Sequence, residues 1–360
     1  MRVITPSFFI LRRIMKRRLN YPIIGLIASK NPVSALVLTV QSLLENGAVR
    51  VVVVDDGSDD KDAVAVFKAV ELIGGEVIHL PRNVGKAKAL REGFKTISAY
   101  SIIIQADDDA ICGDLERPAE LIRSRKADIV DIRIEAARTK SLIGQVQEIS
   151  YWLMNAVAKR VQDIFRARLW LSGCSLMYSH AAGKELIMRK AYTMTEDTEG
   201  LFRARKKGLT VRYCSNKKSA FVTMVPEDFV SVRKQWQRWT IGNAQVMSIY
   251  GLGGGNPRIA TINVLAWLYL LVLPILPFVY DGALMTLIWW FINGIVIGII
   301  AGIRLKRPYL LIVGIVFPLV GLLWTYHALE GFWLAYRRAQ RGGNVSLAWV
   351  SPKRAATIDA

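Results

Sequence analysis

Short apolar runs alternate with amphipathic stretches over the first two thirds of the chain. The runs IIGLIAS at 23–29 and VRVVVV at 49–54 predict buried parallel strands, because strands covered on both faces are apolar throughout. Between them, SALVLTVQSLLENG predicts a helix that stops at Gly47. The runs EVIHL, SIIIQA and ADIVDIRI, separated by helical stretches, continue the series. The alternation predicts a doubly wound α/β domain over residues 21–220.

Three long apolar runs dominate the last third of the chain. Residues 262–280, 283–303 and 309–329 contain no Lys, Arg, Asp or Glu, and roughly 20 such residues suffice for a helix to cross a membrane. We therefore expect an integral membrane protein with a C-terminal α-helical transmembrane region. A second path for the last run is a hairpin, broken at Pro318 and Gly321, that returns near Glu330.

The expected organisation has five parts. They are a basic amphipathic N-terminal segment (1–20), the α/β domain (21–220), interfacial amphipathic helices (221–260), about three transmembrane helices (261–337) and a C-terminal tail (338–360). The N-terminal FFILRRIMKRRLN is either a helix lying on the bilayer or a disordered basic tail.

The net charge is +19, from 48 Lys and Arg against 29 Asp and Glu. Basic residues cluster at 12–18, 304–307 and 337–341, beside the predicted membrane segments. Lys and Arg favour the cytoplasmic side of a membrane and anionic lipid. The charge is therefore explained by membrane lipids, and no nucleic acid partner is expected. We expect a plasma membrane protein whose catalytic domain is cytoplasmic.

Two predicted strands end in carboxylates. VRVVVV leads into Asp55 and Asp56, and SIIIQA leads into Asp107, Asp108 and Asp109. Ligands of doubly wound sheets bind beyond the carboxyl ends of the strands. These residues are either solvated helix caps or a Mg²⁺ or Mn²⁺ site for a phosphorylated ligand, since gathered carboxylates need an offsetting cation.

Other ways of holding a metal or a phosphate are not indicated. The cysteines and histidines are scattered, so a metal would be held by oxygen, and no Walker-type or dinucleotide-binding loop occurs. Lys86 starts the helix predicted from NVGKAKAL and is either a diphosphate partner or part of a solvated helix face. The scattered residues are Cys112, Cys174, Cys214, His79, His180 and His327.

The stretch RKQWQRWT at 233–240 lies just before the apolar third. On a helix, Gln235, Arg238 and Trp239 share one face, because they are three and four residues apart. The stretch is either an interfacial belt, which Trp and Arg favour, or part of a functional site. A neighbouring face, expected to rest in the headgroup layer, carries Phe229, Val232 and Trp236.

Taken in order, six motifs resemble the family 2 glycosyltransferases, in particular the membrane-embedded processive synthases of cellulose, chitin and hyaluronan. The motifs are VVVVDDGSDD, NVGKAKALREGF, the pair Asp107-x-Asp109, WLSGCSLMY, TED at 195–197 and QWQRW at 235–239. The resemblance covers residues 21 to 250. It implies a GT-A fold and an inverting transfer from a nucleotide sugar, usually a UDP-sugar, to a saccharide or lipid-linked acceptor.

The resemblance also implies roles for matching residues. Asp197 matches the catalytic base, which takes the proton of the acceptor hydroxyl; capping of the helix predicted from TEDTEGLFRARKKG is the alternative. Asp107 and Asp109 match the metal-binding pair, whose Mg²⁺ or Mn²⁺ would stabilise the departing diphosphate. Counting Gln105-Ala-Asp107 as the pair is the other alignment. In the substrate-binding set, Asp55 and Asp56 contact the uridine, and Gly173 and Cys174 line the acceptor pocket. Gln235, Arg238 and Trp239 close the site. Lys86, as a diphosphate partner, and Glu196 complete the set.

Two features qualify the resemblance. AWVSPK at 348–353 resembles the gating loop of cellulose synthases, with Ala348 at the aromatic position and Ser351 in place of threonine. The synthases of the family also carry transmembrane helices before the catalytic domain, which this chain does not show. Accessory subunits or a homo-oligomer are therefore expected for export of a polymer.

Three functions stay open at this point. The first is a processive synthase of a β-linked polysaccharide. The second is a non-processive transferase that adds one or a few sugars to a lipid acceptor at the membrane face. The third is a non-catalytic assembly subunit, which loss of Asp197 or of the acidic pair would have favoured.

Overall fold

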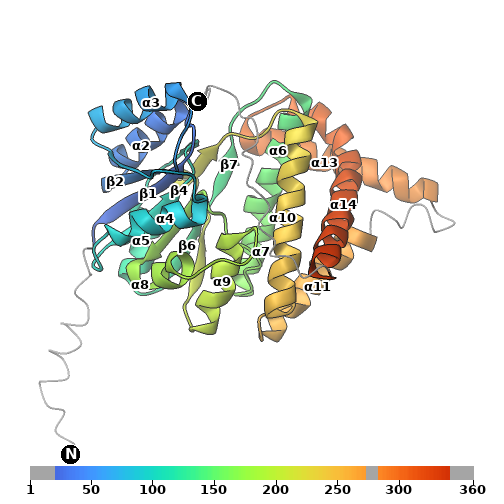
Figure 1. Cartoon of the computed structure of the whole chain (residues 1–360). Helices are drawn as coiled ribbons and strands as arrows, with labels where there is room; N and C mark the ends of the chain where they lie inside the picture. Colours follow the sequence, from blue (N-terminus) through green and yellow to red (C-terminus); the bar gives the residue numbers. More distant parts are fainter. Residues whose placement is uncertain (1–20, 273–282, 341–360) are drawn as a thin grey trace, which may run out of the picture.

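The computed structural model describes residues 21–272 and 283–340. In this part of the chain an α/β domain is followed by long helices that pack against its side (Figure 1). The N-terminal segment 1–20, the candidate gating loop at 348–353 and residues 273–280 of the first apolar run lie outside the described residues.

A seven-stranded sheet forms the centre of the domain, in the order β3-β2-β1-β4-β8-β6-β9. The neighbours pair in parallel, except that β8 runs antiparallel to both β4 and β6. The predicted sheet is confirmed, but its reversed strand was not foreseen. The strands are β1 (Ile23–Ser29), β2 (Ala48–Asp55), β3 (Glu76–His79), β4 (Ile102–Ala106), β6 (Ile129–Ile132), β8 (Ser175–Ser179) and β9 (Val211–Cys214).

The run ADIVDIRI, predicted as one strand, is divided between two sheets. Its first part is β6, and its second part is β7 (Ile134–Ala136), which lies in a three-stranded sheet with β5 (Ala110–Ile111) and β10 (Phe221–Thr223). The small sheet joins the segment after β4 to the segment that leads into the C-terminal helices.

Helices cover both faces of the large sheet, as the apolar strands require. Along β1, Ile23 and Ile27 belong to one hydrophobic core and Ile24 and Leu26 to the other, because successive side chains alternate between faces. The first core is covered by α2 (Ala35–Glu45), α3 (Lys61–Leu72) and α5 (Glu116–Arg123). The second is covered by α4 (Lys86–Lys95), α8 (His180–Gly183) and α9 (Glu196–Lys206).

The remaining helices lie beside the sheet (Figure 1). Among the residues whose placement is described, no helix is both long enough and apolar enough to cross a membrane. The expected transmembrane helices are therefore not supported here. These elements are α6 (Leu142–Leu153), which passes through a π-helical turn into α7 (Lys159–Ile164), then α10 (Phe229–Tyr250), α11 (Pro257–Val272), α13 (Ala283–Leu305) and α14 (Leu310–Gln340).

The hairpin proposed for the last apolar run is wrong, because α14 is one helix with Pro318 inside it. Glycines let α14 approach α13 closely at this level. A Cβ on Gly298 would lie 2.7 Å from Cα of Gly314, and a Cβ on Gly294 would lie 2.7 Å from the ring of Pro318. Small residues at such crossings allow two helix backbones to come into contact.

A buried polar cluster fixes α14 and its preceding loop to the α/β domain. The carboxylate of Glu148, on α6, accepts hydrogen bonds from Arg307 Nη1 at 2.6 Å, Tyr309 Oη at 2.8 Å and the N–H of Thr139 at 3.0 Å. The Glu148 side chain is fully buried. The helices after residue 283 are thus tied to the domain by a paired, buried charge.

Helix α14 also packs against α10. Glu330 accepts hydrogen bonds from Arg233 at 3.0 Å and from Gln237 at 2.7 Å. A Cβ on Gly331 would lie 2.7 Å from Cβ of Thr240, so the absence of a side chain permits this contact. The last described helix therefore supports the helix that carries QWQRW.

Candidate active site

The first acidic turn closes the carboxyl end of β2. Asp56 accepts hydrogen bonds from the N–H groups of Val84 (2.7 Å) and Gly85 (2.9 Å), and Asp55 accepts one from the N–H of Ser58 (2.8 Å) and contacts His79 Nδ1 at 2.8 Å. Burial raises the pKa of Asp56, although the two backbone donors oppose the shift. The turn thus holds the loop before α4 beside the sheet edge.

The second acidic turn follows β4 and divides its carboxylates between different partners. Asp107 forms an ion pair with Lys86, the first residue of α4, and Asp108 accepts a hydrogen bond from Ser29 Oγ at 2.6 Å. Asp109 is buried. Burial would lower the pKa of Lys86, but Asp107 and Glu196 outweigh it and raise this pKa. Lys86 therefore points into the acidic site rather than lying on a solvated helix face.

The fit of a divalent cation depends on the donors near Asp107 and Asp109. In the described part of the chain, no group of three or more His, Cys, Asp or Glu side chains is arranged to hold a metal. Two carboxylates are nevertheless a fitting protein share for Mg²⁺ or Mn²⁺, since a bound diphosphate supplies further oxygens. The charges of Asp107 and Asp109 both raise the pKa of the Cys174 thiol, so both carboxylates lie near that residue. The side-chain amide of Gln105 instead donates a hydrogen bond to the carbonyl of Gly173. Asp107 and Asp109 therefore stay the predicted pair, and Gln105 is engaged with the Gly173 loop.

Asp197 lies in the first turn of α9, facing the same site. Its Oδ2 accepts a hydrogen bond from the N–H of Gly173 at 3.0 Å, and its Oδ1 accepts one from the N–H of Thr198 at 2.7 Å. Burial, and then the charge of Glu196, raise the pKa of Asp197 to about 6, against the opposing effect of Lys86 and Arg238. The carboxylate thus accepts a hydrogen bond in the first turn of its helix, and its environment favours the protonated form up to about pH 6.

The loop before β8 connects Asp197 to the sheet. The carbonyl of Gly173 accepts a hydrogen bond from Gln105 Nε2 at 2.9 Å, and its N–H donates to Asp197. Burial, followed by the charge of Asp107, raises the pKa of the Cys174 thiol to about 12. Cys174 therefore serves as a small neutral side chain in the wall of the site.

Helix α10 brings the QWQRW face to this site. Arg238 acts electrostatically on both Asp197 and Lys86, and Trp239 packs with Cys174 against the same apolar cluster. Gln235 is partly buried on the same helix face. The expectation that Val232 and Trp236 rest in the headgroup layer is wrong, because they are only 2% and 5% exposed. The buried face of the stretch therefore packs against the rest of the described chain, and Arg238 and Trp239 lie close to Asp197 and Cys174.

Direct contacts fix α10 against the TED segment. A Cβ on Gly242 would lie 2.5 Å from Cγ2 of Thr195, closer than real Cβ contacts allow. Gln245 Oε1 accepts a hydrogen bond from the N–H of Met194 at 2.9 Å. The position of Asp197 therefore depends on α10 as well as on the Gly173 loop.

A layer of buried charge lies behind the loop. Asp131 forms ion pairs with Lys159, at 3.2 Å, and with Arg168, and all three side chains are at most 1% exposed. Lys159 also donates a 2.6 Å hydrogen bond to Ser172 Oγ, one residue before Gly173. The layer supports the backbone that donates to Asp197.

Several of these supporting residues were not singled out from the sequence. The sequence showed His79 only as a scattered histidine and Gln105 only as part of the other alignment of the acidic pair, and Gly242 lies within an ordinary helical stretch. The sequence does contain a signal for Lys159 and Asp131, because each is a charged residue within an otherwise apolar or helical segment. A buried charge in such a segment needs a partner of opposite charge.

Comparisons with known proteins agree with this geometry. The family model described as "Glycosyl transferase family group 2" matches residues 102–329. The chain is similar to the poly-beta-1,6-N-acetyl-D-glucosamine synthases of Staphylococcus aureus (26% identical over 201 residues, 55% of this chain and 48% of the relative) and Staphylococcus epidermidis (25% over 208 residues, 57% and 50%). It thus spans about half the length of these relatives.

A solved structure is similar to nearly the whole chain. It is a mannosyltransferase from Pyrobaculum calidifontis in complex with GDP-Man and Mn²⁺, with a TM-score of 0.56, 14% identity, and coverage of 91% of this chain and 93% of that one. At this identity the likeness concerns the fold, a GT-A-like α/β fold.

Proposed function

Because the chain belongs to the glycosyl transferase family group 2, we propose that it transfers a sugar from a nucleotide sugar to the hydroxyl of a growing β-linked polysaccharide. The transfer inverts the anomeric configuration, since a base on the face opposite the leaving nucleotide permits a single displacement. The relatives are named as synthases of an N-acetylglucosamine polymer. We take a UDP-linked N-acetylhexosamine as the donor to be tested first.

The observation that carries the proposal is the environment of Asp197. A partly buried carboxylate with a pKa of about 6 accepts two backbone hydrogen bonds and lies near Lys86 and Arg238. A base near neutral pKa removes a hydroxyl proton most effectively when it is held within hydrogen-bond reach. In the proposal, Asp197 takes that proton as the acceptor oxygen attacks the anomeric carbon.

The basic side chains have a role on the donor side. Arg238 presents a planar fork of donors that suits phosphate oxygens, and Lys86 is paired with Asp107 and also feels the charge of Glu196. Asp55 and Asp56 border the place proposed for the uridine. Asp107 and Asp109 would hold Mg²⁺ or Mn²⁺, which neutralises charge on the departing diphosphate when bound. When the nucleotide binds, its phosphate oxygens become partners of Lys86 in place of part of the Lys86–Asp107 ion pair.

The acceptor is expected on the side of Trp239 and Cys174. An indole face suits the apolar face of a pyranose ring, and Trp239 packs beside Cys174 at the wall of the site. Gln235, on the same face of α10, is placed to bind sugar hydroxyls. Gly173 leaves room there, because it has no side chain.

The experiment that tests the proposal uses the full-length protein with Mg²⁺ or Mn²⁺ and a panel of radiolabelled UDP- and GDP-sugars. High-molecular-weight label that a specific glycanase digests would support a processive synthase and identify its sugar. Label confined to an organic-extractable product would support the second candidate, transfer of one or a few sugars to a lipid acceptor. Absence of transfer from every donor would contradict both.

We further propose attachment to the plasma membrane with a cytoplasmic catalytic domain. One support is the set of long uncharged runs in the sequence. The other is a stripe of exposed apolar side chains on α13, spaced three and four residues apart, which we propose that lipid covers. The stripe comprises Leu284, Ile288, Ile292, Ile295, Ile299 and Ile303. Retention in the membrane fraction after an alkaline wash tests attachment, and release by the wash would contradict it.

A further inference from the structure

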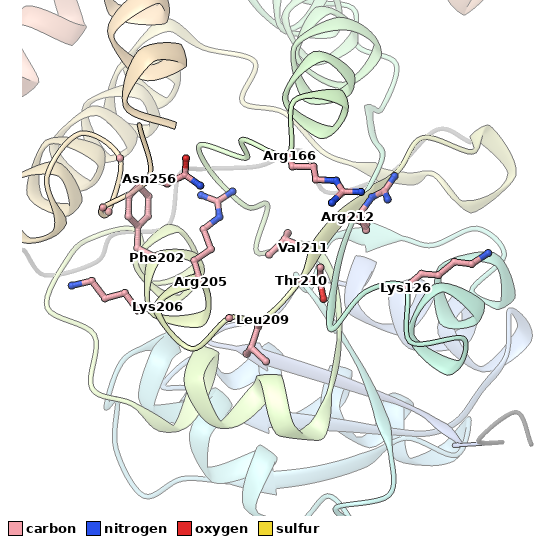
Figure 2. Close-up of a pocket in the computed structure, with 14 residues that line it drawn as sticks. Lys126, Arg166, Phe202, Arg205, Lys206, Leu209, Thr210, Val211, Arg212 and Asn256 are labelled. Carbon is pink, nitrogen blue, oxygen red and sulfur yellow. The ribbon is translucent and has the colours of Figure 1, made fainter. Parts of the chain in front are cut away.

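A pocket lies at the far end of α9 from the candidate active site. It encloses about 410 Å³, and it is lined by α9, by the loop into β9 and by the turn before α11 (Figure 2). Arg205 lines it and is eight residues beyond Asp197, which corresponds to about 12 Å along the helix. The pocket is therefore separate from the acidic site, although one rigid helix connects them.

The pocket is strongly cationic. Its lining includes five basic side chains, and none of the described residues that line it is Asp or Glu. Arg212 is offset by Asp163, at 3.1 Å, but within the described residues no carboxylate forms an ion pair with the other four. The five are Lys126, Arg166, Arg205, Lys206 and Arg212.

Arg205 is the most informative of these side chains. Its Nη1 is buried, and among the described residues it has no hydrogen-bond partner. Burial lowers the pKa of Arg205 to about 10. Figure 2 shows the side chain reaching from α9 toward Asn256. A buried, charged N–H group without an acceptor is costly, and an anion in the pocket would supply the acceptor for Nη1 of this partly buried side chain.

The backbone of the turn before α11 also favours an anion. Asn256 caps α11, since its side chain accepts a hydrogen bond from the N–H of Arg258 at 3.0 Å. Gly254 and Gly255 precede it with positive φ angles of 58° and 90°, and a Cβ on Gly254 would lie 2.8 Å from the ring of Phe202. The N-terminus of this 16-residue helix adds partial positive charge to that of the side chains.

We propose that this pocket binds a phosphate group, carried either by an anionic lipid headgroup or by a soluble phosphate compound. Guanidinium groups from three segments of the chain and a helix N-terminus line one cavity, and planar guanidinium forks match phosphate oxygens. The inference is independent of the proposed sugar transfer, because it rests on a different set of residues.

The test is equilibrium binding to the full-length, detergent-solubilised protein with saturating UDP present. One arm titrates radiolabelled inorganic phosphate at fixed ionic strength, and the other titrates dihexanoyl phosphatidic acid, with dihexanoyl phosphatidylcholine as the reference. We expect saturable binding in at least one arm that UDP does not displace. Binding in the lipid arm alone assigns a headgroup, and binding in the phosphate arm alone assigns a soluble ligand.

Matched variants locate the site. Arg205→Gln and Arg166→Gln should each weaken binding by about tenfold, the effect of losing one charge-assisted hydrogen bond. Lys207→Gln, on an exposed neighbour outside the pocket, should change it less than about twofold. If Arg205→Gln fails to fold, the exposed Arg166 carries the test. Absence of saturable binding in both arms, displacement by UDP, or equal binding by Arg166→Gln and wild type would overturn the proposal.

Discussion

The N–H of Gly173 donates a 3.0 Å hydrogen bond to Oδ2 of Asp197, while its carbonyl accepts one from Gln105 Nε2. The residue thereby connects the end of β4 to the proposed base. Because Gln105 is buried in the central sheet, the base is positioned from a rigid element. Substitution of Gly173 therefore tests whether this connection positions Asp197.

Gly173→Ala should lower kcat by about tenfold while the chain stays folded. The added Cβ would meet Asp197 Oδ2 at 3.3 Å, which is tight, so the carboxylate must move by a few tenths of an ångström. Misplacement of about 1 Å at a reacting group costs about 100-fold. Steady-state kinetics and a thermal melt measure both quantities. A kcat equal to wild type would show that the loop does not position the base.

Transfer activity should depend on an ionisation near pH 6. The pKa of Asp197 is raised from 3.8 to about 6, chiefly by burial and then by Glu196, so the rate should rise through pH 6 and level off above it. Because the folded chain holds this proton more tightly than the unfolded chain, ionisation of Asp197 reduces stability as the pH rises from 3.8 to about 6.

Glu196→Gln should move this acid limb to lower pH, since the substitution removes a negative charge next to Asp197. Glu92→Gln, an exposed substitution on α4, serves as the control and should leave the limb in place. The measurement is kcat/KM from pH 4.5 to 8. An unchanged limb in Glu196→Gln would assign the ionisation to another group.

Gly242→Ala should destabilise the chain by about 1 to 3 kcal/mol, the range for forcing an extra carbon into a packed contact. The new Cβ would overlap Thr195, so α10 and the TED segment must separate. We expect kcat to fall with stability. Denaturant unfolding and kinetics test this, with Ser248→Ala at an exposed site of the same helix as the control. Equal stability of both variants would contradict the contact.

Removal of Arg307 should cost about 3 kcal/mol, because it leaves the buried carboxylate of Glu148 without its cation. Arg307→Met combined with Glu148→Gln should recover part of this loss, since the second change removes the charge that was left behind. A double-mutant cycle of unfolding free energies measures the coupling. Additive effects of the two substitutions would show that the pair does not anchor α14.

The local pattern of the sequence was sufficient for much of the sheet and for the carboxylates at its edge. Apolar runs predicted β1, β2 and β4, and the acidic turns after β2 and β4 do lie at the edge of the sheet where Lys86 and Asp197 are found. The helix that begins at Glu196 was also predicted, and it ends just before Gly208. These features depend on residues close together in the chain.

Features that depend on distant residues could not be predicted in this way. The reversed direction of β8 is set by its pairing with β4 and β6. The burial of Trp236 depends on elements that are distant from it in the sequence. An interfacial belt and a buried helix face share the same apolar spacing, so the spacing alone did not distinguish them. The contact of Gly242 with Thr195 likewise joins residues 47 positions apart.

The most direct test of the account compares catalysis and nucleotide binding in Asp197→Asn. The amide cannot take a proton, and Asp197 has no proposed role in holding the nucleotide. We predict a loss of transfer of at least about 1,000-fold under single-turnover conditions and a Kd for UDP within about threefold of wild type. Wild-type turnover in this variant would remove Asp197 from the chemistry and contradict the central claim.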